Sequence, residues 1–407
     1  MNKQIVIVGG GFAGLWAALA AARETDSAAR PPAITLVSQD EHLTMRPRLY
    51  EQNPARLREP LRPILDSLNI PLRLGAVRDI DTTGGRIAAE TPAGTDKWIA
   101  YDRLILAAGS RLVSPAIPGL AEHAWNIDTH AAAMALDDHL RGIVAKPDSP
   151  GRDTIVIVGA GFTGIEMACE MRTRLAAHGG DEAAARTRVI LVEWAGAVDP
   201  DLGANPRPSI EAALAATEVE VRLGTQVTEI DSDSVTLSTG EQIVAATTIV
   251  TTGMRASPLT ATLNVKCDEY GRLPVDDYLR VKGVDGIYAC GDMARAYVDE
   301  DNLALMSCQH AMPMGRFAGH NTVCDLLSRP LRPYRQPRYV TCLDLGTAGA
   351  VFTAGWQREV RMIGNEAKLL KQQINSELIY PPKGGRAALL AAAEIAPPAP
   401  AEPSPAN

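Results

Sequence analysis

The apolar positions of this chain repeat one pattern twice, 150 residues apart. IVIVGGGFAGLW occupies residues 5–16 and IVIVGAGFTGIE occupies residues 155–166, with eight of twelve positions identical. Each copy begins with four β-branched residues, a continuous apolar run that is typical of a buried strand in a parallel sheet. Helix-forming sequence follows in both copies, as LWAALAAARE and as IEMACEMRTRL. The pattern predicts two strand–turn–helix units, each in its own α/β sheet.

The turn of each unit contains three glycines with the spacing G-x-G-x-x-G. They are Gly9, Gly11 and Gly14 in the first copy, and Gly159, Gly161 and Gly164 in the second. In this motif the first glycine allows a tight turn, the second lets a pyrophosphate approach the backbone, and the third lets helix and strand pack closely. One such motif is weak evidence, but two between a strand and a helix predict two dinucleotide sites. We expect one cofactor to stay bound while the other delivers electrons to it.

The residue that ends the second strand of each unit distinguishes the two sites. RVILVEW places Glu193 there in the second unit, where a carboxylate accepts from the ribose 2′-hydroxyl of NAD and repels the 2′-phosphate of NADP. AITLVSQDE places Ser38 there in the first unit, where an acid is usual. The second site is predicted to prefer NAD. At the first site Ser38, Asp40 and Glu41 all stay candidates for the ribose contact.

Composition narrows the class of protein. The chain has 407 residues, 46% of them apolar, and a net charge of −8, which suits two or three folded domains and argues against nucleic acid as a partner. The first strand follows Met1 so closely that no signal peptide is expected, and no apolar run reaches the roughly 18 residues of a membrane span. We expect a cytoplasmic location. The six cysteines show no C-x-x-C spacing, so neither a redox disulfide nor a metal site is expected.

Two later segments resemble signatures of flavoproteins with two dinucleotide-binding domains. DRLILAAGS (102–110) resembles the strand and turn that close their first FAD segment, with Ala108 and Gly109 at the turn. GIYACGDMA (286–294) resembles their second FAD signature, in which the carboxylate at Asp292 holds the ribitol chain. The resemblance implies that the first unit binds FAD and that the second is an NAD-binding insertion.

The fold expected from this resemblance is α/β with two Rossmann-like dinucleotide-binding domains. The expected boundaries are residues 1–112 and 256–330 for the FAD domain, 113–255 for the NAD domain, 331–395 for a small C-terminal region, and 396–407 for a disordered Pro/Ala-rich tail.

The chain resembles type II NADH dehydrogenases in particular, which pass electrons from NADH through FAD to quinone. HLTMRPRLYE (42–51) resembles their segment beside the flavin, and TTGMRASPL (251–259) resembles their return into the FAD domain. CQHAMPMGRFAGHN (308–321) is similar to the helix that reaches flavin and quinone. The resemblance implies a place for Glu166 beside the nicotinamide. It also implies cofactor contacts from Arg48, Val77 and Gly253.

Departures from that family leave the electron acceptor open. Gln309 matches the first glutamine of the family's quinone-binding pair, but Pro313 stands in place of the second. Because proline disfavours a helix interior, the helix is expected to begin near Pro313. His310, with an ordinary pKa near neutrality, is a candidate proton donor to the acceptor, and a purely structural role is its alternative.

The C-terminal region also departs from the family, which carries an aromatic-rich membrane anchor there. Residues 331–395 hold nine Lys or Arg against five Asp or Glu, a net charge of +4. A narrow apolar stripe, Ala367, Leu370, Ile374 and Leu378, favours a helix packed on protein or on a second copy of the chain, with a helix lying on the membrane as the alternative. A homodimer and peripheral contact with the inner face of the membrane both stay open.

The leading hypothesis is an NADH-oxidising FAD enzyme whose acceptor is a quinone or a quinone-like compound. Its candidate catalytic residues are Glu166, Gln309 and His310. One alternative is an NADH-dependent reductase of a small electron-carrier protein, for which the basic C-terminal region would supply a docking surface. Another is a redox-sensing flavoprotein that turns over slowly with every acceptor.

Overall fold

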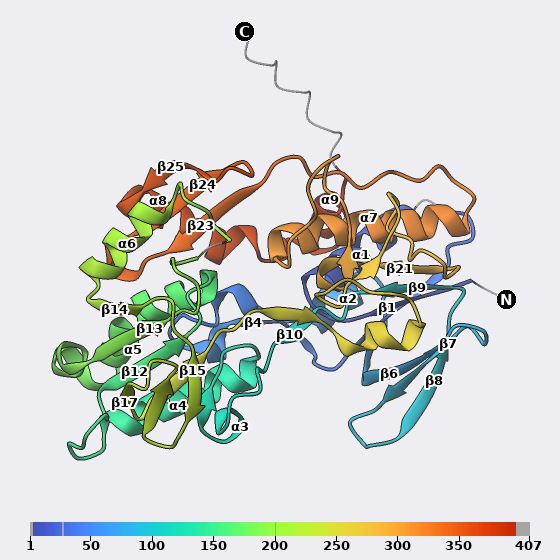
Figure 1. The fold of residues 1–407 in the computed structure, drawn as a ribbon. Helices are drawn as coiled ribbons and strands as arrows, with labels where there is room; N and C mark the ends of the chain where they lie inside the picture. Colours follow the sequence, from blue (N-terminus) through green and yellow to red (C-terminus); the bar gives the residue numbers. More distant parts are fainter. Residues whose placement is uncertain (1–2, 27, 200, 396–407) are drawn as a thin grey trace, which may run out of the picture.

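Two parallel five-stranded sheets form the centre of the computed structural model, which describes residues 3–26, 28–199 and 201–395 (Figure 1). The first sheet has the order β21-β9-β1-β2-β5, and every neighbouring pair is parallel. Its strands are β1 (Gln4–Val8), β2 (Ala33–Ser38), β5 (Leu72–Leu74), β9 (Arg103–Leu106) and β21 (Ile287–Ala289). The predicted α/β class is confirmed.

The second sheet has the order β11-β18-β12-β13-β14 and repeats the first at four of its five strands, while its edge strand β11 precedes the others in the chain and β21 follows them. Its strands are β11 (Ala124–Trp125), β12 (Thr154–Val158), β13 (Arg188–Val192), β14 (Val219–Arg222) and β18 (Thr247–Val250). The registers also match, since Val8 pairs with Val37 and Val158 pairs with Val192. Ser38 and Glu193, each one residue further on, therefore occupy equivalent positions. The two similar stretches of sequence, residues 5–16 and 155–166, therefore occupy equivalent places in two similar sheets.

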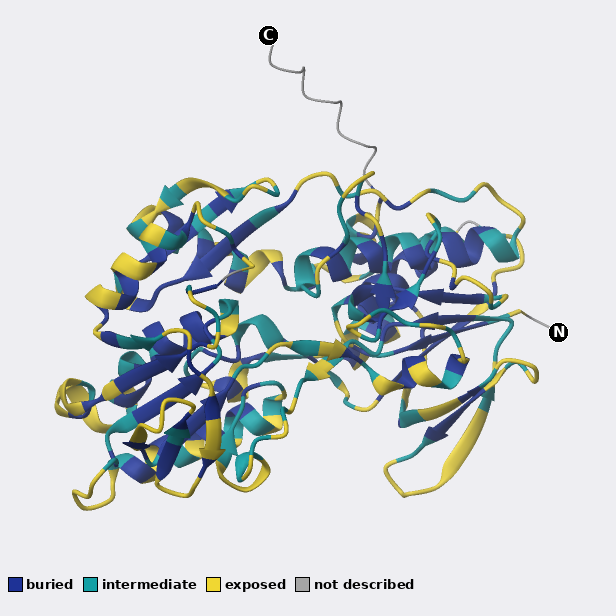
Figure 2. Cartoon of the chain, viewed as in Figure 1, coloured by how far each residue is buried: buried dark blue, intermediate teal, exposed yellow. Residues whose placement is uncertain are grey.

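A helix follows the glycine turn in each unit, as predicted. These helices are α1 (Phe12–Thr25) and α5 (Phe162–Arg186), and α5 is kinked at Gly180, where φ is +72°. Helices α4 (His130–Val144) and α6 (Arg207–Ala216) complete the second unit. Figure 2 shows that the strands of both parallel sheets are buried, while the exposed residues lie on loops, on helix surfaces and on the smaller antiparallel sheets.

Each unit also carries a three-stranded antiparallel sheet, and two short strands connect the units. The antiparallel sheets consist of β6 (Ala76–Asp81), β7 (Arg86–Glu90) and β8 (Asp96–Ala100), and of β15 (Val227–Ile230), β16 (Ser234–Leu237) and β17 (Gln242–Val244). The chain leaves the first unit along β10 (Ser110–Leu112) and returns along β19 (Met254–Ala256), and these strands pair antiparallel. The second unit is thus inserted into the first through two adjacent crossings.

Helix α7 (Cys308–Leu326) packs against α1 through a seam of small residues. A methyl group added at Gly315 would lie 2.3 Å from the carbonyl oxygen of Ala13, and one added at Gly319 would lie 2.2 Å from that of Ala17. The residue numbers increase together along both helices, so α1 and α7 run in the same direction with their backbones in contact. This seam fixes α7 against the helix that begins at the first glycine turn.

We expect Gly319→Ala to lower the free energy of unfolding by about 1–3 kcal/mol, because the added methyl overpacks the seam. Gly142→Ala in α4 is the matched control. Its added methyl meets no atom within 4 Å, and glycine in a helix costs about 0.5–1 kcal/mol relative to alanine, so this variant should be slightly more stable. Urea unfolding of both proteins measures the difference, and equal stabilities would contradict the seam.

The C-terminal region forms a third, antiparallel sheet with helices around it. It consists of β23 (Val340–Asp344), β24 (Ala350–Ala354), β25 (Glu359–Ile363), α8 (Gly364–Gln373), a π-helical turn (Ile374–Leu378) and α9 (Gly385–Ala392). The sheet lies over the second unit and α9 lies beside the first (Figure 1). Arg386 on α9 donates to Ser67 and forms an ion pair with Asp26.

The predicted apolar stripe of this region packs on protein only in part. Ala367 is fully buried against the C-terminal sheet, whereas Leu378 is 57% exposed. In the described part of the chain, no helix is long and apolar enough to span a membrane. The predicted tail at 396–407 lies outside the described residues. The remaining short elements are β3 (His42–Thr44), β4 (Arg58–Pro60), α2 (Leu61–Ser67), α3 (Leu120–His123), β20 (Leu273–Pro274), β22 (Ala294–Arg295) and several 3₁₀ turns.

Candidate functional site

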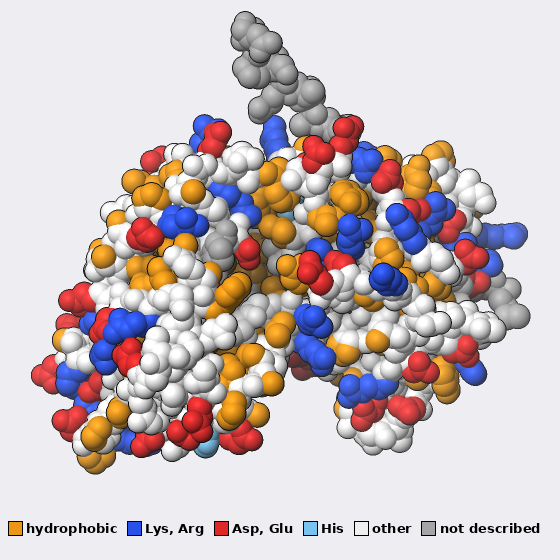
Figure 3. Space-filling view, in the orientation of Figure 1, with side chains coloured by type: hydrophobic (Ala, Val, Ile, Leu, Met, Phe, Trp, Pro, Cys, Tyr) orange, Lys and Arg blue, Asp and Glu red, His pale blue; other side chains and the backbone are white. Residues whose placement is uncertain are grey.

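A single large cleft of about 2210 Å³ contains both glycine turns. Its walls come from the first unit, from the second unit and from the C-terminal sheet and helix α8. Figure 3 shows hydrophobic side chains gathered around a hollow in the middle of one face. Because the carboxyl ends of parallel strands are the usual binding edge of such sheets, the cleft lies where the sequence places both dinucleotides.

The glycines divide into those that the fold needs and those that it does not. Gly9 and Gly159 have φ of +115° and +106°, and methyl groups at Gly14 and Gly164 would lie within 2 Å of the carbonyl oxygens of Gly9 and Gly159. By contrast, a methyl group at Gly11 or Gly161 would meet nothing within 4 Å, and both residues have ordinary negative φ. The space left beside the middle glycines is where a pyrophosphate would approach. Both turns therefore fit a dinucleotide.

The wall beside the first turn carries a buried carboxylate held by polar groups. Ser110 Oγ donates to Asp292 Oδ2 at 2.6 Å, and Arg46 Nη1 lies 4.0 Å from the same oxygen. Burial raises the pKa of Asp292. Arg46 also forms an ion pair with Asp128 in the second unit. The same guanidinium therefore lies close to carboxylates of both units, Asp292 and Asp128. This arrangement fits the ribitol-binding role predicted for Asp292.

Most of the predicted cofactor-binding residues of the first unit, and Gly253 at the end of the second, line the cleft. Ser38, Val77, Ala108, Gly109 and Gly253 do so. Arg48 does not: its guanidinium is bound to Glu51 and to the hydroxyl of Tyr380, away from the lining. Arg46, two residues earlier in the same 3₁₀ turn, takes the place expected for Arg48. The resemblance predicts the RPR segment beside the flavin, and the packing shows that Arg46, and not Arg48, faces the cleft.

The residues at the two strand ends, where a ribose is expected, differ in charge: Ser38 is neutral and Glu193 is acidic. Asp40 lines the cleft and forms an ion pair with Arg58, whereas Glu41 is not among the lining residues. Glu193 is 5% exposed, and its carboxylate accepts from the backbone nitrogens of Ala160 at 2.7 Å and Ala195 at 2.9 Å. A carboxylate has capacity for further hydrogen bonds. Glu193 thus braces the second glycine turn and still offers an acceptor to a ribose hydroxyl.

Glu166 forms a buried ion pair with a lysine from the C-terminal region. Glu166 is 3% exposed and Lys371 is 5% exposed, and both line the cleft. Lys371 Nζ lies 2.8 Å from Glu166 Oε1, and the backbone nitrogen of Asp344 donates to the same oxygen at 3.1 Å. Among the described residues no donor reaches Oε2, which is left for a ligand. Glu166 is therefore held in the cleft by contacts 178 and 205 residues away along the chain.

Burial and the ion pair act in opposite directions on the pKa values of Glu166 and Lys371. Burial raises the pKa of Glu166 to about 7, although the Lys371 ammonium acts in the opposite direction. Burial also opposes the charge on Lys371, but Glu166 outweighs it and holds the pKa of Lys371 above its ordinary value. At neutral pH Lys371 is charged and Glu166 exchanges its proton readily, which is the property required of an acid or base in catalysis.

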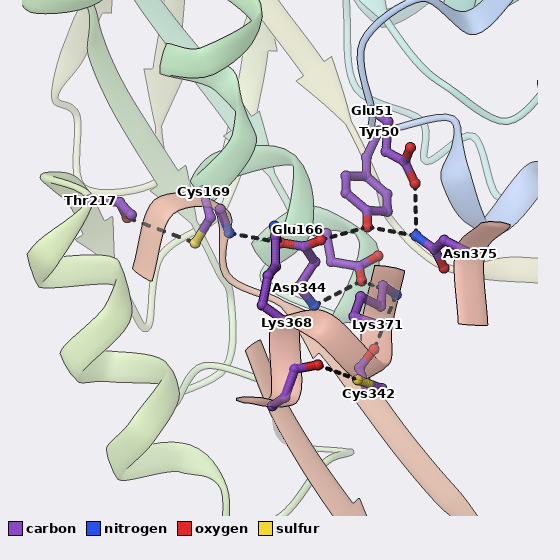
Figure 4. Close-up of polar contacts among 12 residues, drawn as sticks. Tyr50, Glu51, Glu166, Cys169, Thr217, Cys342, Asp344, Lys368, Lys371 and Asn375 are labelled. Carbon is purple, nitrogen blue, oxygen red and sulfur yellow. Dashed lines mark hydrogen bonds and ion pairs between the residues drawn. The ribbon is translucent and has the colours of Figure 1, made fainter. Parts of the chain in front are cut away.

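Further polar groups surround the pair, as Figure 4 shows. Tyr50 donates to Asp344 Oδ2 at 3.1 Å, and Lys368 forms an ion pair with the same carboxylate. Asn375 donates to the Tyr50 hydroxyl at 3.3 Å. Tyr50 comes from the first unit and the other three come from the C-terminal region. Three parts of the chain therefore meet at Glu166.

The residues 3–315 match the family described as pyridine nucleotide-disulphide oxidoreductase. An NADH dehydrogenase-like protein of Mycobacterium tuberculosis is 46% identical over 394 residues, which cover 96% of this chain and 98% of that protein.

The chain belongs to the pyridine nucleotide-disulphide oxidoreductase family.

Other relatives fit the same assignment. A type II NADH:quinone oxidoreductase of M. tuberculosis is 30% identical over 72% of this chain and 67% of its own length. A demethylphylloquinone reductase of Synechocystis is 29% identical over 86% of this chain and 87% of its own length. NDH2 of Plasmodium falciparum, solved with NADH, has the same fold, with a TM-score of 0.78, 14% identity and 97% coverage of both chains. The predicted resemblance to type II NADH dehydrogenases and the use of FAD and NAD are confirmed.

Within this oxidoreductase, the expectation that α7 begins near Pro313 is wrong. The helix begins at Cys308, with Ser307 as its N-cap, and Pro313 lies inside it. A proline leaves the carbonyl four residues earlier without its helical donor, and here that carbonyl belongs to Gln309. The side chain of Gln336 donates to it at 3.1 Å. The distant amide compensates for the proline, so the helix continues.

Gln309 lines the cleft, but its amide is already bonded. Its Nε2 donates to the carbonyl oxygen of Val340 at 2.8 Å, and its Oε1 accepts from the nitrogen of Val340 at 3.1 Å. These bonds fasten α7 to β23. The structure therefore gives Gln309 a positioning role at the wall, while its second N–H and second oxygen lone pair are not used by these bonds.

His310 lies away from the cleft lining and packs among aromatic rings. It is fully buried, stacks on Tyr339 with ring centroids 5.5 Å apart, and its Nδ1 faces Gln336 Oε1 at 3.2 Å. Burial lowers its pKa to about 4. At neutral pH His310 is uncharged, so this geometry supports the structural alternative and not proton donation.

Two thiols line the cleft near Lys371. They belong to Cys308 and Cys342, and burial raises the pKa of each to about 11. All six cysteines are free. At neutral pH both cleft cysteines are protonated, whereas a nucleophilic or redox-active cysteine reacts as the thiolate.

Proposed function

We propose that this protein oxidises NADH and passes two electrons to a quinone or a quinone-like acceptor. The observation that carries the proposal is the shared cleft, in which two dinucleotide turns open toward one buried, proton-exchanging pair. FAD bound at the first turn would accept hydride from NADH and release the electrons to the acceptor. The names of the relatives, among them quinone oxidoreductases and a demethylphylloquinone reductase, support the acceptor class.

The residues of the chain divide the remaining work. The Gly9–Gly14 turn and Asp292 would hold FAD, while the Gly159–Gly164 turn and Glu193 would hold NADH. Holding the two cofactors together in one cleft removes the entropy cost of bringing them into contact in solution. Glu166, one turn into α5, lies between the NADH turn and the C-terminal wall.

Glu166, assisted by Lys371, supplies the proton that reduction of the acceptor consumes. Reduction of a quinone by NADH consumes one proton in addition to the transferred hydride. Glu166, with a pKa of about 7, gives up that proton at neutral pH, and Lys371 stabilises the resulting carboxylate. This role differs from orientation of the nicotinamide, the role that the family resemblance implies. The two half-reactions distinguish these roles, as described in the Discussion.

The acceptor is tested by following NADH oxidation by the purified yellow protein with a panel of acceptors. The panel comprises short- and long-chain quinones, ferricyanide, a ferredoxin, a rubredoxin and oxygen, each with and without liposomes. We expect quinones to give the highest turnover. Preference for a carrier protein would support the reductase alternative, and uniformly slow turnover would support the sensor alternative.

We expect Gly161→Ala to raise the KM for NADH without changing stability. The added methyl meets no protein atom but occupies the space beside the turn. Loss of a hydrogen bond to a charged phosphate costs about 1.5–3 kcal/mol, so KM should rise at least about tenfold. Gly164→Ala is the contrasting variant, because its methyl would lie 1.9 Å from the carbonyl oxygen of Gly159 and should destabilise the fold. Steady-state kinetics and thermal unfolding separate the two, and an unchanged KM in Gly161→Ala would contradict the assignment.

A further inference from the structure

A cluster of three different donor groups lies outside the cleft, where α1 and α7 end together. His320 Nδ1 lies 2.9 Å from Glu24 Oε1, and Cys324 Sγ lies 3.5 Å from His320 Nε2. One ligand atom from each residue can be chosen so that all three lie within 4.8 Å of one another. The redox reaction proposed above uses none of these groups.

We propose that Glu24, His320 and Cys324 form a binding site for a thiophilic divalent metal ion of the Zn²⁺ class. Thiolate, imidazole and carboxylate are the three ligand types that Zn²⁺ takes from proteins. Ca²⁺ and Mg²⁺ prefer oxygen ligands alone and fit the set poorly. Water would complete four-coordination. This proposal stands independently of the identity of the electron acceptor.

The spacing of the donors on α7 suits a tetrahedral ion. His320 and Cys324 are four residues apart and so lie on the same helix face. Nitrogen and sulfur ligands at ordinary zinc distances are separated by roughly 3.6 Å around a tetrahedral centre, and the observed separation is 3.5 Å. Glu24 is bonded to Nδ1, the other ring nitrogen, so its side chain has to rotate away from that nitrogen to reach an ion held by Nε2 and the sulfur. The imidazole and the thiol are already placed for the ion, and Glu24 completes the set.

The backbone fixes these donors before any ion binds. The contacts at Gly315 and Gly319 hold α7 directly against α1, and the cluster continues that seam by one turn. The thiol of Cys324 forms the buried floor, at 2% exposure, while the side chains of His320 and Glu24 are 13% and 23% exposed. An ion can thus enter past Glu24 and His320 and reach the sulfur.

The electrostatic setting also favours a cation. Glu24 is one residue from the end of α1 and Cys324 is two residues from the end of α7, so two helix C-termini point their partial negative charges at the cluster. Two arginines lie near Glu24, but Arg23 pairs with Glu394 and Arg329 donates to the backbone oxygen of Glu24, not to its carboxylate. The carboxylate is left for His320 and for the ion.

Cobalt substitution tests the site in the intact FAD-containing protein. Co²⁺ bound through a thiolate gives a sulfur-to-cobalt charge-transfer band and visible bands of four-coordinate cobalt, measured as a difference from the flavin spectrum. We expect one Co²⁺ per chain, displaced by Zn²⁺, and no charge-transfer band in Cys324→Ser. Cys267→Ser is the matched control, because Cys267 is another free thiol outside the cluster and the cleft lining.

Glu24→Gln provides a second test that keeps the buried floor intact. We expect its affinity for Co²⁺ to fall by about tenfold or more, as for other residues that ligate or orient metal ligands. Zn²⁺ should raise the thermal midpoint of the wild type and of Cys267→Ser, because it binds the folded protein, but not that of Cys324→Ser. Absence of the band from the wild type, or its survival in Cys324→Ser, would overturn the proposal, as would equal Co²⁺ affinity in Glu24→Gln.

Discussion

Glu166→Gln should lower turnover with quinone by about 10²-fold, within the range that a positioned acid or base contributes. Glutamine keeps the size of the side chain but cannot release a proton. In stopped-flow experiments we expect NADH to bleach the flavin absorbance at nearly the wild-type rate, and recovery of that absorbance on mixing with quinone to be slow. The opposite pattern, slow bleaching with normal recovery, would show that Glu166 orients the nicotinamide instead.

The pH dependence of turnover with quinone tests the same role of Glu166, because the expected change has a defined direction. Burial raises the pKa of Glu166 to about 7, so the proton-donating form is lost as the pH rises through 7. We expect wild-type turnover with quinone to fall above pH 7 and Glu166→Gln to lack that limb. Glu170→Gln is the matched control, because burial also raises the pKa of Glu170 to about 7, one turn further along α5, but Glu170 does not line the cleft. Its turnover should stay close to that of the wild type.

Lys371→Met should destabilise the protein by about 3–5 kcal/mol at high pH, because it leaves Glu166 buried without its partner. The loss should depend on pH in a defined direction. Glu166 has a folded pKa of about 7, above its unfolded value of about 4.5, so in the wild type its burial lowers stability as the pH rises from about 4.5 to 7 and adds no further loss above that. Without the Lys371 ammonium the folded pKa rises further. The difference from wild type should therefore be small below pH 7 and grow above it.

Urea unfolding at pH 6 and pH 9 measures this effect. The double variant Glu166→Gln/Lys371→Met removes both charges and should regain most of the stability lost at pH 9. Lys368→Met is the neighbouring control, since Lys368 is partly exposed and its partner Asp344 keeps hydrogen bonds from Tyr50 and the backbone of Gly346. A loss in Lys371→Met that is equal at both pH values would contradict the assignment of the shift to Glu166.

Glu166 and His310 show how burial separates two candidates that look alike in a sequence. Each is an ionisable residue near the start of a predicted helix. Burial moves the pKa of Glu166 up to about 7 and that of His310 down to about 4, because desolvation disfavours the charged form of either group. Only Glu166 thereby has a pKa close to neutral pH, where an acid or base in catalysis is most effective. Glu166 also lines the cleft, whereas His310 does not.

The sequence by itself determined the two strand–turn–helix units with their glycine turns, and from them it predicted two dinucleotide sites and their order. The G-x-G-x-x-G turns depend on local backbone conformation, on one helix and on its adjacent strand, and such short-range requirements leave a mark at fixed spacing. The equivalent places of Ser38 and Glu193 follow from the same local pattern. The choice of FAD for one turn and NAD for the other came from further short motifs that also lie at strand ends.

Tertiary structure alone decided which side chains complete the site. Lys371 meets Glu166 across 205 residues, Gln336 satisfies the carbonyl that Pro313 leaves without a donor, and Arg46 instead of Arg48 turns toward the cleft. The cluster of Glu24, His320 and Cys324 likewise joins two helices far apart in the chain. Such contacts have no periodicity or fixed spacing in the sequence, because they depend on how separate elements pack. No local sequence pattern therefore predicts them.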